Sequence, residues 1–208
     1  MNREEHEEAI AMDRSIEFFD NQFQRQVREG DFSLNPFEKL ALPFLRGRVL
    51  DLGCGLGNLT IEAARRGCPV LAFDASVNAI ERIRNVVAAE GLPVQAELVD
   101  LTAYRISADF DVIVSIGLLM FMKRLQAHEI LKDIHSHVRP GGCAIINVLI
   151  EGTTYLDMFE PGHYYLFGHS ELQDQFAGWD LLESRWDSFE APGPSIKMFA
   201  SVAARKPG

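Results

Sequence analysis

The feature that most constrains the fold is an alternation between residues 48 and 150, where short apolar runs rich in strand-forming residues alternate with helical patterns. The expected strands are 48–52, 69–74, 94–100, 110–116 and 143–150. The expected helices are 58–67, the segment from the N-cap Ser76 to Gly91, and 124–138, which RPGG (139–142) then breaks. Because right-handed crossovers return each strand parallel to the last, this alternation predicts a parallel sheet with helices on both faces.

The pattern changes after residue 150. Residues 151–170 are rich in aromatic residues, glycine and histidine without clean periodicity, and 171–179 indicate one more short helix. The segments 180–190 and 195–205 read as two strands joined by a tight connection, which predicts a hairpin. We therefore expect an α/β fold with a Rossmann-like, seven-stranded, mostly parallel sheet and an antiparallel terminal hairpin. The chain of 208 residues fits a single domain, 1–208, with an N-terminal helical cap over 1–46 and a substrate-side lid over 151–175.

An acidic residue and three glycines follow the first expected strand, in RVLDLGCGLGN (48–58). Ligands of such sheets bind beyond the carboxyl ends of the strands. A dinucleotide fingerprint has the spacing GxGxxG, whereas Gly53, Gly55 and Gly57 give GxGxG. Asp51, two residues before the first glycine, would repel a pyrophosphate and attract a cation. S-adenosylmethionine is a nucleoside without phosphate that carries a sulfonium and an ammonium group.

Two further acidic residues end expected strands. Asp74 ends the second, where a carboxylate can accept hydrogen bonds from both ribose hydroxyls. Asp100 ends the third, beside Leu101, where it can accept one from the adenine amino group. Asp74 alone does not discriminate, because dinucleotide enzymes share it. Each aspartate taken singly can instead be a strand-end cap or a turn residue; their combination with GxGxG favours S-adenosylmethionine.

These segments resemble the class I S-adenosylmethionine-dependent methyltransferases. The resemblance rests on VLDLGCGLGN, VLAFDAS, LVDL, FDVIVSIGLLMF, VRPGGCAIIN and the terminal hairpin, and it covers roughly residues 35–205. It implies that S-adenosyl-L-methionine is the cofactor and that the following residues bind it: Asp51, Gly53, Gly55, Gly57, Asn58, Asp74, Ala75, Asp100, Leu101, Ser115 and Ile116. Within the class, LMFM (119–122) and the segment 167–183 look most like the TehB-type tellurite-resistance methyltransferases, which implies a small acceptor such as a thiol or a chalcogen oxyanion.

Candidate residues on the substrate side follow the fifth expected strand. His163, Tyr165 and His169 are our catalytic candidates, because a histidine there can act as a base or contact an oxyanion. The alternative is that they pack an inserted loop. Phe18, Phe19 and Phe23 can close over the cofactor, although aromatic residues at helical spacing are commonly core residues.

Composition excludes several other functions. A net charge of -10 without a basic cluster argues against a nucleic-acid partner. Three cysteines without CxxC spacing indicate neither a disulfide framework nor a zinc site, and His128, His135 and His137 share no helix face, so we expect no metal. The absence of a leader or membrane-spanning run predicts a cytoplasmic protein with no membrane partner.

Two other function classes are compatible with the sequence. One is a nicotinamide-dependent oxidoreductase, which tight NAD binding would establish. The other is a methyltransferase-like module that binds the cofactor without catalysis, since no catalytic base stands out. The sequence leaves the acceptor and the oligomeric state undetermined.

Overall fold

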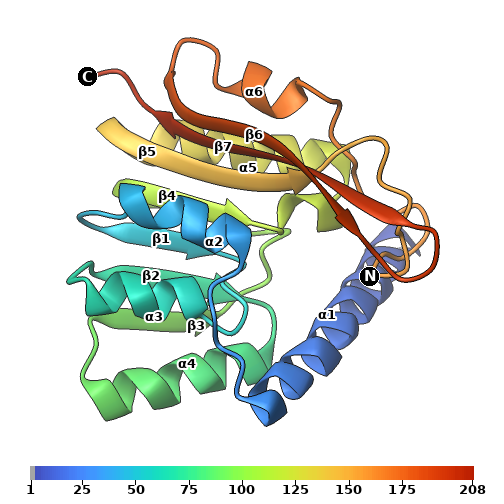
Figure 1. The fold of residues 1–208 in the computed structure, drawn as a ribbon, viewed down its shortest axis with the longest axis horizontal. Helices are drawn as coiled ribbons and strands as arrows, with labels where there is room; N and C mark the ends of the chain where they lie inside the picture. Colours follow the sequence, from blue (N-terminus) through green and yellow to red (C-terminus); the bar gives the residue numbers. More distant parts are fainter. Residues whose placement is uncertain (1–2) are drawn as a thin grey trace.

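The computed structural model describes the backbone of residues 3–208 and the side chains of residues 15–208. A single sheet has the strand order β3-β2-β1-β4-β5-β7-β6 (Figure 1). The strands are β1 (Val49–Leu52), β2 (Val70–Asp74), β3 (Val94–Leu98), β4 (Phe110–Ile116), β5 (Val138–Leu149), β6 (Asp180–Glu190) and β7 (Ile196–Arg205). The first five strands pair in parallel, and β7 pairs antiparallel with both β5 and β6. The predicted seven-stranded sheet with an antiparallel terminal hairpin is confirmed.

Helices cover both faces of this sheet, as the crossovers require. They are α1 (Arg3–Glu29), α2 (Pro36–Ala41), α3 (Asn58–Arg65), α4 (Val77–Glu90), α5 (Arg124–His137) and α6 (Glu171–Gln175), with 3₁₀ turns at η1 (Leu42–Phe44) and η2 (Leu119–Phe121). The buried residues of α2, α3 and α4 pack on one face with Val49 and Val70. Those of α5 and α6 pack on the other face with Leu50 and Leu52. The β1 side chains thus alternate between two cores, and Asp51 lies on the α3 face with Val49.

Local signals set the helix boundaries where the sequence predicted them. The Ser76 hydroxyl caps α4 by accepting a hydrogen bond of 3.1 Å from the Ala79 amide. Gly91 ends the same helix in the left-handed conformation, with φ 65°, and its amide bonds to the Val87 carbonyl.

The largest departure from prediction is at RPGG, which the sequence reading treats as a break between a helix and the fifth strand. β5 in fact begins at Val138 and runs through these residues. Its pairing with β4 shifts register there, since Phe110 pairs with Val138 but Val112 pairs with Cys143. The extra residues form a bulge within the strand and not a turn before it. At β3 the error is smaller, because the strand ends at Leu98 and Asp100 lies beyond it.

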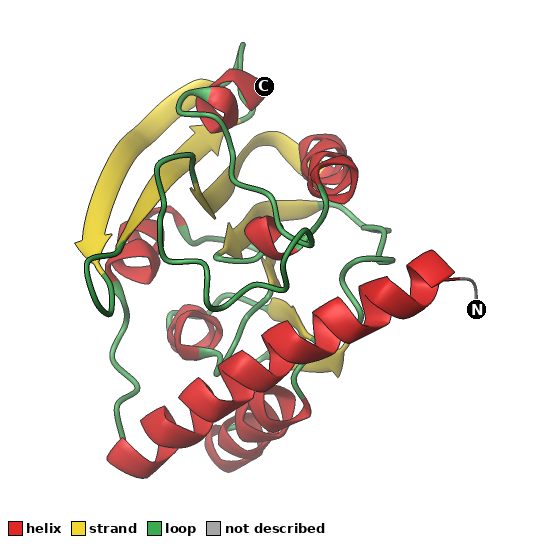
Figure 2. Cartoon of the chain, turned by 90° about the vertical axis from the view of Figure 1, so that its right-hand side faces the viewer, coloured by secondary structure: helices red, strands yellow, loops and turns green. Residues whose placement is uncertain are grey.

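Helix α1 lies across the carboxyl ends of the parallel strands (Figure 2). Asp20 fastens it to the start of α4, accepting hydrogen bonds from the Ser76 hydroxyl and the Asn78 amide. Phe19 packs edge-on against Phe121, with ring centroids 5.1 Å apart. The region predicted as a helical cap, 1–46, corresponds to α1, α2 and η1, with residues 1–2 outside the described part. No helix in the described part has the length and apolarity needed to cross a bilayer.

Candidate functional site

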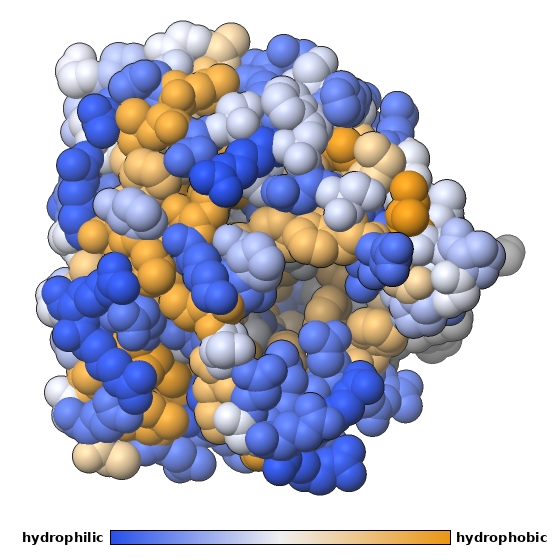
Figure 3. Space-filling model, in the orientation of Figure 1, coloured by the Kyte–Doolittle hydropathy of each residue, from blue (hydrophilic) through white to orange (hydrophobic). Residues whose placement is uncertain are grey.

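A cavity of about 380 Å³ lies at the carboxyl edge of the sheet, under α1. It extends past the ends of β2, β1, β4 and β5 to the first residues of β7, and the surface is hollowed between the strand ends and α1 (Figure 3). Its volume lies within the usual range for small-molecule sites. Among the described side chains, the charged residues in its lining are Glu38, Asp51, Asp74 and Lys197.

Asp51 is the most deeply buried of the three carboxylates, with 5% of its surface exposed. Its Oδ2 accepts a hydrogen bond of 2.6 Å from the Thr60 hydroxyl of α3. Burial raises the pKa of Asp51 to about 7, and the nearby charges of Glu38 and Asp74 act in the same direction against the Thr60 hydrogen bond. The protein surroundings of Asp51 therefore disfavour its ionised form.

Asp74 and Glu38 are shielded in the same cavity. Asp74 accepts hydrogen bonds of 2.8 Å from the Gly55 and Ser76 amides, yet burial raises its pKa. Glu38 completes a capping box by accepting a 2.7 Å hydrogen bond from the Asn35 amide, and burial raises its pKa as well. Among the side chains that the structure describes, no Lys or Arg forms an ion pair with any of these three carboxylates.

The glycine loop has a conformational reason for its composition. Gly53, Gly55 and Gly57 have φ values of 72°, 52° and 74°, which side chains of L-residues rarely adopt. A Cβ on Gly57 would lie 2.4 Å from Ile83 of α4, and one on Gly55 would lie 3.3 Å from Phe23 of α1. The sequence predicts that the backbone of this loop approaches a ligand closely. At Gly55 and Gly57 the backbone instead closely approaches other parts of the chain.

Most of the predicted cofactor-binding residues lie together in the cavity lining: Asp51, Gly53, Gly55, Asn58, Asp74, Ala75, Leu101 and Ile116. Gly57, Asp100 and Ser115 are not among the lining residues. Asp100 is exposed, and its Oδ1 accepts hydrogen bonds from the Thr102 amide and hydroxyl at 2.9 and 2.7 Å. Within the described residues, four buried side-chain oxygens have no hydrogen-bond partner: Asn58 Oδ1, Ser115 Oγ, Asn147 Oδ1 and Gln173 Oε1. Asn58 and Asn147 line the cavity, so it presents unsatisfied acceptors to a ligand.

The three predicted catalytic residues lie outside the cavity lining. His163 is within 3.3 Å of the Pro161 carbonyl in its own turn. The His169 ring stacks on Trp186 of β6, with centroids 5.3 Å apart. Tyr165 belongs to a polar cluster on the α5 side of the molecule. The structure therefore does not bring these residues together, and their catalytic role stays a prediction.

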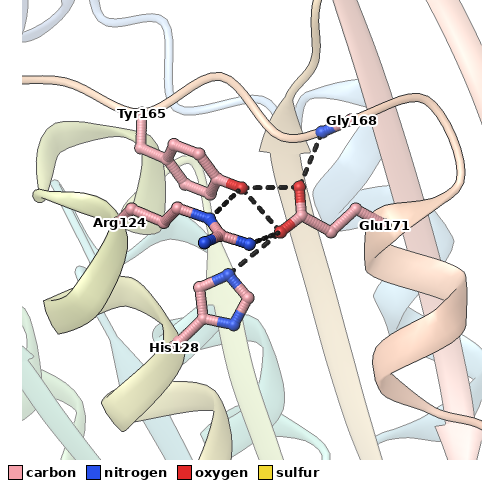
Figure 4. A network of polar contacts seen from close by, with 5 residues as sticks. All are labelled: Arg124, His128, Tyr165, Gly168 and Glu171. Atoms are coloured by element: carbon pink, nitrogen blue, oxygen red, sulfur yellow. Dashed lines mark hydrogen bonds and ion pairs between the residues drawn. The ribbon is translucent and has the colours of Figure 1, made fainter.

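The cluster that holds Tyr165 is centred on Glu171 of α6 (Figure 4). Glu171 accepts hydrogen bonds from the Tyr165 hydroxyl at 2.6 Å and the Gly168 amide at 2.8 Å, and it lies 3.0 Å from His128 Nε2. Arg124 is 3.7 Å away. Burial tends to raise the pKa of Glu171, but the hydrogen bonds from Tyr165, Gly168 and His128 outweigh it and leave the pKa lowered. The cluster ties α5, the 151–170 segment and α6 together.

Several lining residues were not identified from the sequence: Glu38, Asn147, Met158, Lys197 and Phe199. Glu38 had a readable signal, since Asn35 followed three residues later by glutamate is a capping box. Lys197 had none, because the side of β7 that faces the cavity is set by the register of β7 against β5, which the sequence did not indicate. The aromatic residues Phe18, Phe19 and Phe23 do line the cavity, as the sequence suggested.

A mostly parallel sheet with this strand order, an antiparallel β7 and an acidic residue before a glycine loop define the class as Rossmann-like methyltransferase folds. The crystal structure of TehB from Haemophilus influenzae superposes with a TM-score of 0.74 at 25% identity, covering 87% of this chain and 65% of that one. The chain belongs to the TehB family, because the model for "Tellurite resistance protein TehB" matches residues 38–191.

Two curated relatives extend the comparison. A protein named hemagglutinin 1, from Eikenella corrodens, is 30% identical over 170 residues, which cover 77% of this chain and 55% of the relative. A probable S-adenosyl-L-methionine-dependent methyltransferase TehB from Haemophilus influenzae is 30% identical over 166 residues, covering 76% and 57%. The chain thus matches little more than half the length of either relative.

Proposed function

We propose that this chain is an S-adenosylmethionine-dependent methyltransferase acting on a small acceptor. The observation that carries the proposal is the set of three shielded carboxylates, Glu38, Asp51 and Asp74, in one cavity without a basic partner among the described side chains. Burying like charges without compensation is unfavourable, and a cationic ligand relieves it. A sulfonium with an α-ammonium group supplies that charge, whereas a pyrophosphate would worsen the repulsion.

The residues of the cavity fit such a cofactor. Asp51 and the glycine loop would hold the methionine moiety, with Asn58 offering its unpaired oxygen to the ammonium group. Asp74 has one hydrogen bond on each carboxylate oxygen, so both oxygens retain the capacity to accept from ribose hydroxyls. Leu101 would contact the adenine, with Asp100 beyond the edge of the cavity, and Ile116 would line the methyl-donor side next to the buried Ser115.

The bound cofactor would supply an electrophilic methyl group, whose carbon–sulfur bond breaks as the bond to the acceptor forms and whose electron pair stays on sulfur. The chain's own contribution is positioning, which accelerates a reaction between two bound partners. Phe18, Phe19 and Phe121 line the cavity on the α1 side, where they would shield bound molecules from water. A soft anionic acceptor needs no protein base at the moment of attack, and no histidine is found among the described side chains that line the cavity.

Family membership makes a thiol or a chalcogen oxyanion such as tellurite the first acceptors to examine. The acceptor would enter between α1 and the 151–175 segment, which provides Met158 to the cavity.

Isothermal titration with S-adenosylhomocysteine, with NAD as the control, tests the cofactor directly. We expect the former to bind and NAD not to. Binding of NAD alone would replace the proposal with a nicotinamide-dependent oxidoreductase. Binding of S-adenosylhomocysteine with no methyl transfer to any of a broad acceptor panel would favour a non-catalytic module.

A further inference from the structure

Lys197 is the basic residue among the described side chains of the cavity lining, and it lies far from Asp74 along the sheet. Asp74 ends β2 and Lys197 begins β7, and β1, β4 and β5 lie between them. Four strand spacings of about 4.8 Å separate these two strands by about 19 Å across the sheet. Because β7 is antiparallel, its first residues meet the last residues of the parallel strands at one edge. The cavity therefore has an acidic end and a basic end.

The register of β7 directs Lys197 toward the cavity. Lys197 and Phe199 line it, whereas Met198 between them contacts the core on the opposite face. This register is fixed from outside the hairpin, because Thr153 and Thr154 hydrogen-bond to Met198 and Ile196 on either side of the lysine. The sheet and the start of the 151–170 segment thus hold Lys197 at the end of the cavity.

Lys197 lacks an anionic partner in the described part of the chain. Its Nζ lies 4.7 Å from the centroid of the Tyr155 ring, a cation–π contact, and no ion pair to it is found among the described side chains. Burial lowers the pKa of Lys197. A half-buried ammonium without a counter-charge is the complement of the buried carboxylates at the other end, and it would gain from an anionic ligand.

The walls next to Lys197 are apolar. Met120, Leu149 and Met158 are buried in one cluster, against which Phe18, Phe121 and Phe199 pack. A bare inorganic oxyanion requires several hydrogen-bond donors, and these side chains supply none. An organic molecule with one anionic group can place its charge on Lys197 and its body against the methionines and aromatic rings.

We propose that Lys197 binds the negative charge of the methyl acceptor, and that this acceptor is a small organic anion whose apolar body packs against Met120, Met158 and Phe199. The inference rests on the proposed function, since it assigns the β2–β1–β4 part of the cavity to the cofactor and the β5–β7 part to the acceptor. Lys197 would thereby select the acceptor, and the cofactor would bind without it.

The test uses the protein saturated with S-adenosylhomocysteine and measures binding of matched probes by calorimetry. Benzoate and 4-methylbenzoate are the anions, benzamide and 4-methylbenzamide are the uncharged controls, and tellurite is the inorganic anion. We expect each carboxylate to bind wild-type protein at least about tenfold more tightly than its amide, as for a charge-assisted hydrogen bond. Lys197→Met should abolish this preference and Lys197→Arg should keep it.

Any of four results would overturn the proposal. Two concern wild-type protein: equal binding of carboxylates and amides, or tighter binding of tellurite than of the carboxylates. Two concern Lys197→Met: a preference for carboxylates that survives the substitution, or a tenfold loss of S-adenosylhomocysteine affinity. The last would mean that the lysine holds the cofactor's own carboxylate. The first comparison requires no variant, so a folding defect in Lys197→Met leaves the proposal testable. A failure of the proposed function is distinct, because wild-type protein would then not bind S-adenosylhomocysteine at all.

Discussion

Asp51 and Glu171 are both shielded carboxylates, yet their pKa values move in opposite directions. Glu171 receives hydrogen bonds from Tyr165, Gly168 and His128, and its pKa is lowered (Figure 4). Asp51 has the Thr60 hydroxyl as its partner and neighbours of like charge, and its pKa rises to about 7. The Glu171 cluster is electrostatically complete within the chain. The acidic end of the cavity has no such balance among the side chains from residue 15 onward, which is the expected difference between a site that stabilises the fold and one that binds a ligand.

The largest effect is expected for Asp51→Asn, which keeps the shape of the side chain and removes its charge. The affinity for S-adenosylmethionine should fall by about 1.5–3 kcal/mol, the range for a hydrogen bond to a charged group. Calorimetry measures this, with Glu171→Gln as the matched loss of a shielded carboxylate outside the cavity. Unchanged affinity in Asp51→Asn would remove the difference that we draw between the two regions.

The raised pKa of Asp51 should also make the stability of the folded chain depend on pH. The folded chain holds the Asp51 proton more tightly than the unfolded chain, whose carboxyl has a pKa near 3.8. This contribution to stability is complete below that value and is lost as the pH rises through about 7. Urea unfolding of the ligand-free protein measures this effect. From pH 5 to pH 8, Asp51 should lower the free energy of unfolding by about 2–3 kcal/mol, because each pKa unit corresponds to about 1.4 kcal/mol. Asp51→Asn should lose this component, and an identical pH profile in the variant would contradict the assignment.

Glu171→Gln should destabilise the fold by about 1–3 kcal/mol at neutral pH, because Tyr165 and His128 lose their charged partner. The sign of its pH dependence is opposite to that of Asp51: a lowered pKa gives stability that is present above the ordinary carboxyl value and lost as the pH falls through the folded one. The variant and wild type should therefore converge in stability in acid. Cofactor affinity should be nearly unaffected, and a large loss of it would place the cluster in the binding machinery.

The smallest effect is expected for Asp100→Ala. The side chain is exposed and already accepts two hydrogen bonds from Thr102, so its contact with adenine should contribute about 0.5–1 kcal/mol to binding. Titration with S-adenosylhomocysteine resolves such a difference when Asp74→Ala is measured in parallel. If Asp100→Ala weakened binding more than Asp74→Ala, the ranking of the two carboxylates would be reversed.

The parts of the fold that were predictable are those with local signals. Strand composition, the Ser76 cap and the Gly91 ending are read from neighbouring residues, and the structure agrees with them. RPGG misled because proline and glycine favour turns and bulges alike, and only the pairing partner β4 decides between the two.

The candidate site was predictable where parallel strands end, since Asp51 and Asp74 line the cavity. The site was not predictable where a residue is positioned by a segment distant in the sequence. His169 and Trp186 come from different segments of the chain, and their stacking depends on where β6 passes. Lys197 faces the cavity because of the register in which β7 pairs with β5, and no local pattern indicated that register.

The connection at 191–195 is the part of the hairpin whose length can vary without moving Lys197. The Ala191 amide closes this turn onto the Ser195 carbonyl. Because Thr153 and Thr154 hold the start of β7 from outside the hairpin, a residue added to or removed from the turn would leave the register of the strand unchanged. A one-residue slip would instead move every buried side chain of β7 to the opposite face. Acceptor preference should therefore change by substitution at position 197, and insertions between β6 and β7 should leave it as it is.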